Sequence, residues 1–203
     1  MNTSFHRLII DSATPYLYVA LLEGNRSIQT YYKKGDNNHS EVLMPTVETL
    51  FKDSGLSIND IDEVIVGIGP GSYTGVRIGV VVAKMIAWNQ RITIKTVSSL
   101  ALMASSESSD GYILAHIDAR RKNAFMGLYL KQNGLIEPIG DEVFMSSKAF
   151  QEKVPYPFTI VESGEPDPKV LLASNILTPV ENVHHLAPNY LRKTEAERNL
   201  SNS

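Results

Sequence analysis

The spacing of hydrophobic and polar residues changes several times along this chain, and each change predicts a different secondary-structure element. Segments that alternate or run apolar, and that are rich in β-branched and aromatic residues, predict strands at 7–12, 16–24, 27–34, 63–68 and 93–97. Helical spacing predicts helices at 38–54, at 74–89 and from Ser98 or Ser99 onward. The resulting order, β-β-β-α-β-α-β-α, predicts an α/β fold class.

The predicted helix at 74–89 is apolar on almost every side. Arg77 and Lys84 supply its only charges, and they lie on one narrow stripe. A helix that covers one face of a sheet needs an apolar stripe of only about 100 degrees. The extra apolar surface therefore predicts a protein partner. The expected contact residues on this helix and on the helix at 38–54 are Met44, Val47, Val81, Met85 and Trp88.

A glycine-rich loop at 69–75 joins the strand at 63–68 to this apolar helix. The loop is no P-loop, because no Lys-Ser or Lys-Thr follows Gly75, and it lacks the third glycine of a dinucleotide-binding loop. Two interpretations stay open. Gly69, Gly71 and Gly75 either let the helix pack closely on its own strand, or they present backbone to an anion or a docking partner. Arg77 is a candidate contact for a partner carboxylate or a nucleotide phosphate.

A weak internal repeat appears when Asp11 is aligned with Asp118, because both copies then read as strand, turn, strand, turn. Coincidence is the alternative. Taken as real, the repeat predicts duplicated β-β-β-α-β-α units. That is the plan of the actin-like superfamily of actin, heat-shock ATPases and sugar kinases (ASKHA, RNase H-like), in which nucleotide lies between two halves. We expect a first lobe at 1–98 and a second, abbreviated lobe at 99–203 that ends in a polar tail.

Two predicted hairpin turns carry residues with possible phosphate chemistry. Asp11 begins the first turn, where actin-like ATPases hold phosphate and hydrated magnesium, but Pro15 removes a backbone donor there. In the aligned second turn, Arg120 and Arg121 stand where phosphates would meet backbone amides, and such a pair can hold a phosphate bidentately. The alternative is a solvated turn with two surface cations.

Composition and spacing exclude several kinds of chemistry. A formal charge of -3 and a pI near 6.0 argue against nonspecific nucleic-acid binding by the whole surface. The absence of cysteine excludes disulfides, thiol catalysis and Cys-ligated metals. We predict no metal site, because Leu43 stands where a second ligand would follow His39. The serine-hydrolase motif Gly-x-Ser-x-Gly is absent. With no signal peptide and no apolar run of membrane-spanning length, we expect a cytoplasmic protein.

The chain resembles the TsaB, or YeaZ-type, family of subunits that take part in making threonylcarbamoyladenosine in tRNA. The resemblance covers most of the chain. It rests on four motifs that keep the family's order: His39-Ser40 with Leu43 and Pro45, then GPGSYTGVRIG at 69–79, IDARR at 117–121 and PNYLR at 188–192. The chain departs from the pattern at Ser12-Ala13, where Thr-Ser is common, and in its short second half.

The resemblance implies a glycoprotease-like protein that has lost its metal and is neither a peptidase nor an enzyme on its own. Catalysis then belongs to a paralogous partner, TsaD, which binds metal and ATP, so no cofactor is expected here. Members pair through the two helices of the first lobe, with themselves or with TsaD, and the ATPase TsaE joins the assembly. Contact with tRNA is expected to be indirect. The main alternative is an independent actin-like ATPase or small-molecule kinase that uses Asp11 and Asp118 around magnesium. A residual peptidase is a lesser one.

Overall fold

The computed structural model describes residues 4–36 and 38–191, and its first lobe is built on a sheet of six strands within those residues. The spatial order is β11-β5-β4-β1-β2-β3, with β1 (His6–Asp11), β2 (Tyr16–Glu23), β3 (Arg26–Lys34), β4 (Glu63–Gly67), β5 (Thr93–Val97) and β11 (Thr178–Pro179). The first three strands form an antiparallel meander, and β4 runs parallel to both β1 and β5. The predicted order of elements is confirmed, with bounds that agree within about two residues.

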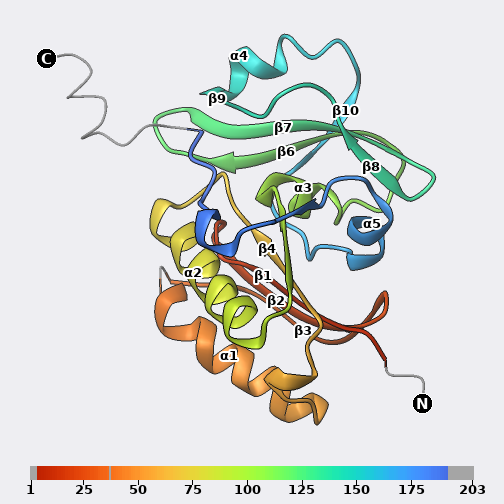
Figure 1. Cartoon of the computed structure of the whole chain (residues 1–203). Coiled ribbons are helices and arrows are strands. Elements are labelled where there is room, and N and C mark those ends of the chain that lie inside the picture. The colour runs from red at the N-terminus through yellow and green to blue at the C-terminus, as the bar shows by residue number, and fades with distance from the viewer. Residues whose placement is uncertain (1–3, 37, 192–203) are drawn as a thin grey trace, which may run out of the picture.

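Two long helices, α1 (His39–Ser54) and α2 (Tyr73–Gln90), lie side by side on one face of this sheet (Figure 1). Gly55 ends α1 in the left-handed conformation, with φ at 71°, which glycine adopts without steric cost. Ser98 caps α3 (Ser99–Ala104) by accepting hydrogen bonds from the backbone of Leu100 and Ala101. A glycine and a serine thus mark the end of one helix and the start of another.

The second lobe repeats the first on a smaller scale. Its sheet has the order β10-β6-β7-β8, with β9 also paired to β7, and comprises β6 (Gly111–Asp118), β7 (Asn123–Gln132), β8 (Leu135–Pro138), β9 (Val143–Ser146) and β10 (Phe158–Val161). As β4 lies parallel to β1, so β10 lies parallel to β6. Its helices are short, since α4 (Ser147–Gln151) has 5 residues and α5 (Pro168–Ala173) has 6, against 16 and 18 in the first lobe. The duplicated and abbreviated plan is confirmed.

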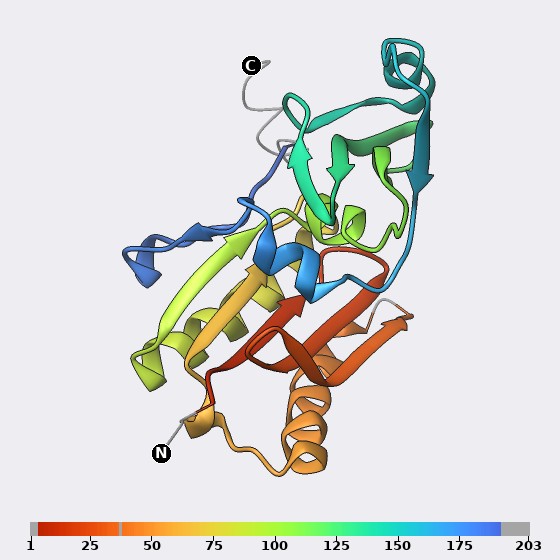
Figure 2. The same cartoon turned by 90° about the vertical axis from the view of Figure 1, so that its right-hand side faces the viewer.

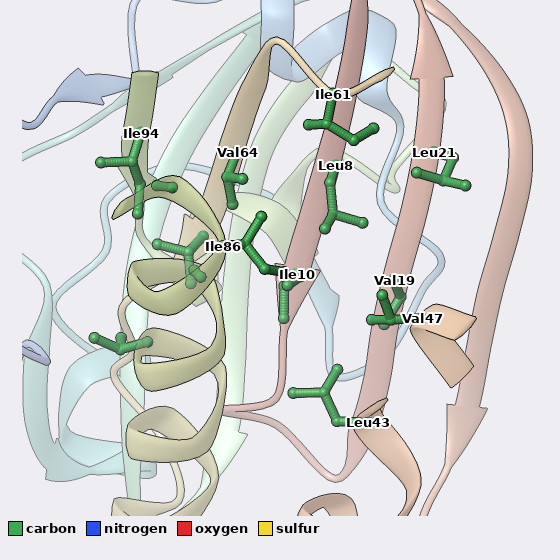
Figure 3. Close-up of a cluster of buried hydrophobic side chains, with 14 of the residues drawn as sticks. Leu8, Ile10, Val19, Leu21, Leu43, Val47, Ile61, Val64, Ile86 and Ile94 are labelled. Atoms are coloured by element: carbon green, nitrogen blue, oxygen red, sulfur yellow. The ribbon is translucent and has the colours of Figure 1, made fainter. Parts of the chain in front are cut away.

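The core consists of apolar layers on the two faces of the first sheet. Alternation along β1 sends Leu8 and Ile10 toward α1 and α2 and sends Ile9 to the opposite face (Figure 3). On that opposite face, α3 and α5 pack between the first sheet and the second (Figure 2). Because β1 is buried on both faces, it reads as a continuous apolar run. The layer around α3 and α5 contains residues of both sheets and therefore holds the two lobes together.

The end of the chain returns to the first lobe. β11 pairs antiparallel with β5, and the single turn η2 (Val183–His185) then packs against α2. The prediction that 99–203 forms one second lobe is therefore wrong for this segment, because strand pairing with the distant β5 decides where it lies. We call residues 178–190 the C-terminal strap. The predicted polar tail at 194–203 lies outside the described residues.

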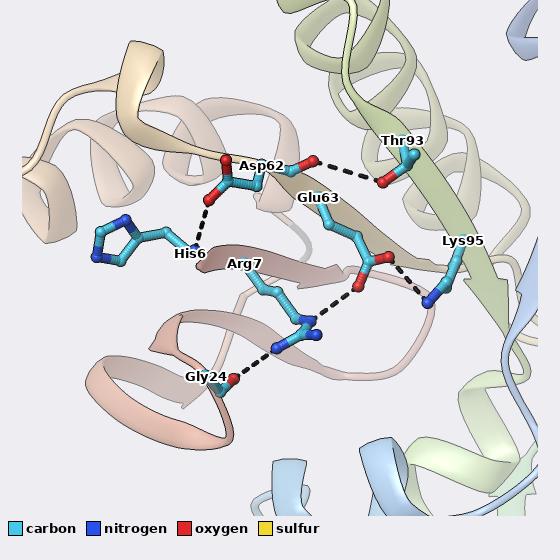
Figure 4. Close-up of polar contacts among 7 residues, drawn as sticks. All are labelled: His6, Arg7, Gly24, Asp62, Glu63, Thr93 and Lys95. Carbon is cyan, nitrogen blue, oxygen red and sulfur yellow. Dashed lines mark hydrogen bonds and ion pairs between the residues drawn. The ribbon is translucent and has the colours of Figure 1, made fainter. Parts of the chain in front are cut away.

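A buried carboxylate joins three strands of the first sheet at one end (Figure 4). Glu63, at the start of β4, accepts a hydrogen bond at 2.8 Å from Arg7 Nε of β1 and lies 2.9 Å from Lys95 Nζ of β5. Its side chain is 5% exposed, while those of Arg7 and Lys95 are 19% and 33% exposed. Arg7 also donates to the carbonyl of Gly24 in the β2–β3 turn. One carboxylate thus neutralises two cations from neighbouring strands.

Replacing this carboxylate is expected to destabilise the first sheet. Glu63→Gln keeps the size of the side chain but leaves Arg7 and Lys95 as neighbouring cations without a counter-charge. We expect the free energy of unfolding to fall by about 1–3 kcal/mol, less than for a fully buried pair because both cations reach solvent. Urea denaturation measures it. Glu23→Gln, which removes the charge of an exposed carboxylate that contacts Ser4 and Arg26, is the control and should change stability by less than about 1 kcal/mol.

Candidate functional site

An exposed apolar stripe runs along the outer side of α2. Val81, Met85 and Trp88 recur at helical spacing and are 51%, 64% and 64% exposed. On the neighbouring α1, Met44 is 43% exposed. We call these four residues the helical face. Large apolar side chains gathered in this way, rather than scattered singly, are typical of a surface that contacts another protein. The predicted surplus of apolar surface on α2 is present.

Val47 does not belong to the helical face, and its prediction as a partner contact is wrong. It is 2% exposed and lies with Leu43 and Leu50 on the side of α1 that covers the sheet (Figure 3). The helical period of about 3.6 residues places positions 43, 47 and 50 on one side, and the sheet already occupies it. Met44, the residue after Leu43, points away from the sheet.

The glycine loop at 69–75 packs against the first hairpin turn of the same chain. A Cβ on Gly71 would lie 2.2 Å from the carbonyl oxygen of Ala13, and a Cβ on Gly75 would lie 2.1 Å from that of Ser12. Ser72 N donates to Ala13 O at 2.7 Å, and Ser12 Oγ donates to Gly75 O at 2.7 Å. These contacts give Gly71 and Gly75 a structural role in close packing, but against the β1–β2 turn and not against β4, the strand that precedes the helix. The interpretation of the loop as an anion or partner site stays a prediction.

Asp11 is buried behind this loop rather than presented to a ligand. Its Oδ1 accepts hydrogen bonds from Ser99 Oγ at 2.9 Å and from Ala13 N at 3.1 Å. Ser99 Oγ in turn accepts from Gly69 N at 3.1 Å. Burial raises the pKa of Asp11 from an ordinary 3.8 to about 6, although the hydrogen bonds from Ala13 and Ser99 offset part of the effect. The carboxyl therefore ties β1, α3 and the glycine loop together.

The raised pKa makes Asp11 a source of pH-dependent instability. Because the folded pKa exceeds the unfolded one, the folded chain holds this proton more tightly. The protonated Asp11 carboxyl costs the folded state nothing in charge burial, so stability is greatest below about pH 4. Stability falls as the pH rises through about 6 and the buried carboxyl loses its proton. Asp11→Asn keeps an acceptor oxygen for Ser99 and Ala13 but carries no charge. We expect urea denaturation to give the variant a free energy of unfolding that is higher than the parent's by up to roughly 3 kcal/mol at pH 7. Near pH 4 the two free energies should match. A constant difference across that range would contradict the assignment.

The cleft between the lobes, beside Asp11, is closed by the chain itself. Only about 10 Å³ of space remains there, room for one water molecule. Tyr18 and Tyr32 of the first lobe fill it together with the second-lobe loop at 162–166. Tyr32 accepts a hydrogen bond from Gly164 N at 2.8 Å. A nucleotide site needs several hundred Å³, so a nucleotide fits this cleft only if the lobes separate.

The two cations of α2 hold the C-terminal strap. Arg77 Nε donates to the hydroxyl of Tyr190 at 2.7 Å, and its guanidinium lies 4.1 Å from the ring centre of Tyr73, which stacks on Tyr190. Lys84 donates to the carbonyls of His184 and Leu186, each at 3.1 Å. The strap therefore follows α2 from Trp88, whose ring meets that of His184, to the glycine loop. An open groove of about 620 Å³ lies beside Trp88, between α2, β5 and the strap.

The place of the strap could not be predicted from the sequence, although PNYLR at 188–192 is one of the family motifs. Of that motif, Arg192 lies outside the described residues. Tyr190 is missed because its partners, Tyr73 and Arg77, are more than a hundred residues away. A tyrosine within a recognisable motif was the available signal.

The remaining predicted site residues lie apart from the helical face. Arg120 and Arg121 are exposed in the β6–β7 turn, with φ of 66° and 53°, so their role in anion binding stays a prediction. His39 is buried, and its Nε2 lies 3.0 Å from the carbonyl oxygen of Thr14. Across residues 4–36 and 38–191, no three His, Asp or Glu side chains are grouped as metal ligands. Over the same residues, no helix is long and apolar enough to cross a membrane.

Comparisons with known proteins match this fold. The family model described as "TsaD: tRNA N6-adenosine threonylcarbamoyltransferase" matches residues 33–163, more than half of the chain. The structure titled "YeaZ from Pseudomonas aeruginosa" aligns with a TM-score of 0.76 over 92% of this chain and all of that one, at 24% identity. A second structure from that organism, titled as similar to peptidase YEAZ, gives a TM-score of 0.77 over 93% of this chain and all of its own.

Several curated relatives carry the name TsaB. The "tRNA threonylcarbamoyladenosine biosynthesis protein TsaB" of Bacillus subtilis is 43% identical over 65% of this chain and 58% of its own length. The protein of that name in Escherichia coli is 30% identical over 72% of this chain and 65% of its own length. The chain thus spans less than two thirds of either relative. An uncharacterized Mycobacterium tuberculosis protein, at 26% identity, matches over 94% of this chain and 93% of itself.

The duplicated sheets, the matching family model and the structural neighbours together fit an actin-like α/β protein of the ASKHA type. The chain belongs to the tRNA N6-adenosine threonylcarbamoyltransferase (TsaD) family and, within it, to the TsaB, or YeaZ-type, proteins.

Proposed function

We propose that this chain is a noncatalytic subunit that binds and activates a catalytic TsaD paralogue. The complex transfers a threonylcarbamoyl group to the adenosine next to the anticodon of tRNA. The observation that carries the proposal is the helical face, where Val81, Met85 and Trp88 are each more than half exposed on one helix. Specific interfaces bury roughly 800 Å² per partner, and two adjacent helices of 16 and 18 residues offer a surface of that size. The description of the matching family model names the threonylcarbamoyl transfer, and the names of the relatives give the pathway.

The closed cleft supports the noncatalytic part of the proposal. An independent ATPase or small-molecule kinase must place a nucleotide and magnesium between the lobes, beside Asp11. Here that space is about 10 Å³, and Asp11 is engaged with Ser99 and Ala13. ATP and metal then belong to the TsaD paralogue, and the TsaE ATPase joins the assembly. The contact of this subunit with tRNA is indirect. In the absence of TsaD, a second copy of the chain takes the same helical face.

The test is reconstitution with the cognate TsaD paralogue. The two chains should co-purify, and modification of tRNA should require both, together with TsaE, ATP and the threonylcarbamoyl donor. Alone, this chain should show no ATP turnover above buffer. Turnover by the isolated chain that Asp11→Asn abolishes would favour the independent ATPase. Full modification without this chain would refute the proposal.

A further inference from the structure

A serine and a histidine meet on the outer face of the second sheet, and a glutamate from the loop at 162–166, which also borders the cleft between the lobes, reaches the histidine. Alternation along β6 sends Ile113, Ala115 and Ile117 toward α3 and leaves His116 on the opposite face, which β9 and α4 cover. Ser147 is the first residue of α4, and Glu162 follows β10. Three separate elements therefore bring these side chains together, which no local sequence pattern signals.

The distances are those of a nucleophile, a base and an orienting carboxylate. His116 Nε2 lies 3.1 Å from Ser147 Oγ, and His116 Nδ1 lies 3.1 Å from Glu162 Oε1. A carboxylate beside Nδ1 favours the tautomer that carries its proton there, and Nε2 is then free to accept from the serine hydroxyl. Gln151 Nε2 donates to Ser147 Oγ at 3.0 Å, so the hydroxyl has its acceptor side occupied and its proton directed at His116.

The surroundings fit a base that is shielded but reachable. The His116 side chain is 12% exposed, beside a small apolar cluster that contains Leu114 and Met126. Glu162 is 70% exposed, and Ser147 is partly exposed at the start of α4. No Gly-x-Ser-x-Gly motif surrounds the serine. Such constellations recur on unrelated folds, however, and are recognised by geometry and roles rather than by sequence position.

We propose that Ser147 is an activated nucleophile that takes an acyl group from an activated acyl donor, such as a reactive ester or mixed anhydride. Ser147 Oγ attacks the acyl carbon while His116 Nε2 takes the hydroxyl proton. The new Oγ–C bond replaces the bond to the leaving group, which departs with that proton from His116. Glu162 stabilises the histidine while it is charged. The product is one ester per chain. This inference is independent of the helical face and of any TsaD partner.

The full-length chain treated with p-nitrophenyl acetate tests the proposal. Intact-mass spectrometry should show one acetyl group per chain, and peptide mapping should place it on Ser147. Ser147→Ala should abolish the labelling. The control is Ser146→Ala at the neighbouring cap of α4, whose hydroxyl accepts only a long 3.5 Å bond from Ala149 N. It should be labelled at the parent rate.

Two further variants separate an activated serine from a hydroxyl that merely fastens α4 to the sheet. His116→Gln can still hydrogen-bond Ser147 but removes the base, and labelling should slow by about 100-fold or more. Glu162→Gln replaces an exposed side chain, so the fold should be preserved, and labelling should slow by about 10-fold or more. Near-UV circular dichroism establishes that each variant is folded. Acetylation at another site, no acetylation, or a Glu162→Gln rate equal to the parent's would overturn the proposal.

Discussion

Val81→Glu or Met85→Glu is expected to abolish binding to the TsaD paralogue while leaving a folded, monomeric chain. Both side chains are at least half exposed, so a carboxylate at either position stays hydrated in the free subunit. In a complex that covers the helical face, the same carboxylate loses its water without gaining a partner. That loss costs several kcal/mol, enough to weaken binding by about three orders of magnitude or more.

Leu135→Glu is a matched control for these charge insertions. Leu135 is also a large apolar residue, 47% exposed, but it lies on β8 of the second lobe. Isothermal titration of each variant against the paralogue should show parent affinity for Leu135→Glu only. Parent affinity for both helical-face variants would mean that the partner binds elsewhere on the subunit.

Gly71→Val and Gly75→Val are expected to cause the largest loss of stability among single changes at the glycine loop. The first atom of a side chain would come within 2.2 Å of the Ala13 carbonyl oxygen at position 71, and within 2.1 Å of the Ser12 carbonyl oxygen at position 75. Both distances are far shorter than an ordinary carbon–oxygen contact. A backbone carbonyl cannot rotate away as a flexible side chain can, so either the β1–β2 turn or α2 must shift. We expect the free energy of unfolding to fall by about 3 kcal/mol or more.

Urea denaturation of these valine variants should be compared with Gly140→Asn. A Cβ on Gly140 would have no other atom within 4 Å, and asparagine tolerates the positive φ of 77° at this position. That control should stay within about 1 kcal/mol of the parent. Arg77→Ala, in contrast, should loosen the hold of α2 on Tyr190 without changing the close contacts of the loop. Parent stability in both valine variants would show that the close approach to the first hairpin turn is unimportant.

The first lobe could be predicted from the sequence because its signals are local. Gly55 ends α1 and Ser98 begins α3. Each strand is recognised from the alternation of its own few residues. The exposed part of the helical face was also predictable, since a helix too apolar for one sheet must leave apolar side chains uncovered. Period alone, however, could not say on which side of α1 the sheet would lie. This is why Met44 and Val47, three residues apart, were predicted together although only Met44 is exposed.

What the sequence could not supply are contacts between distant segments. Asp11 is polar and stands in a predicted turn, so only the arrival of Ser99 and the glycine loop makes it a buried structural group. The closing of the cleft depends on Tyr32 meeting Gly164, and the cluster at His116 depends on Ser147 and Glu162. Each pairing is set by the packing of the lobes, which leaves no periodic trace in the chain.

The C-terminal strap also affects the order in which this protein is completed during synthesis. α2 emerges from the ribosome about a hundred residues ahead of Tyr190, which at about 5–20 residues per second means a delay of roughly 5 to 20 seconds. Throughout that interval Lys84 lacks the two carbonyls it binds in the finished chain, and the flank of α2 beside Trp88 is open to water and to chaperones. A nascent chain therefore presents α2 without the contacts of the C-terminal strap until residues 178–190 have been made.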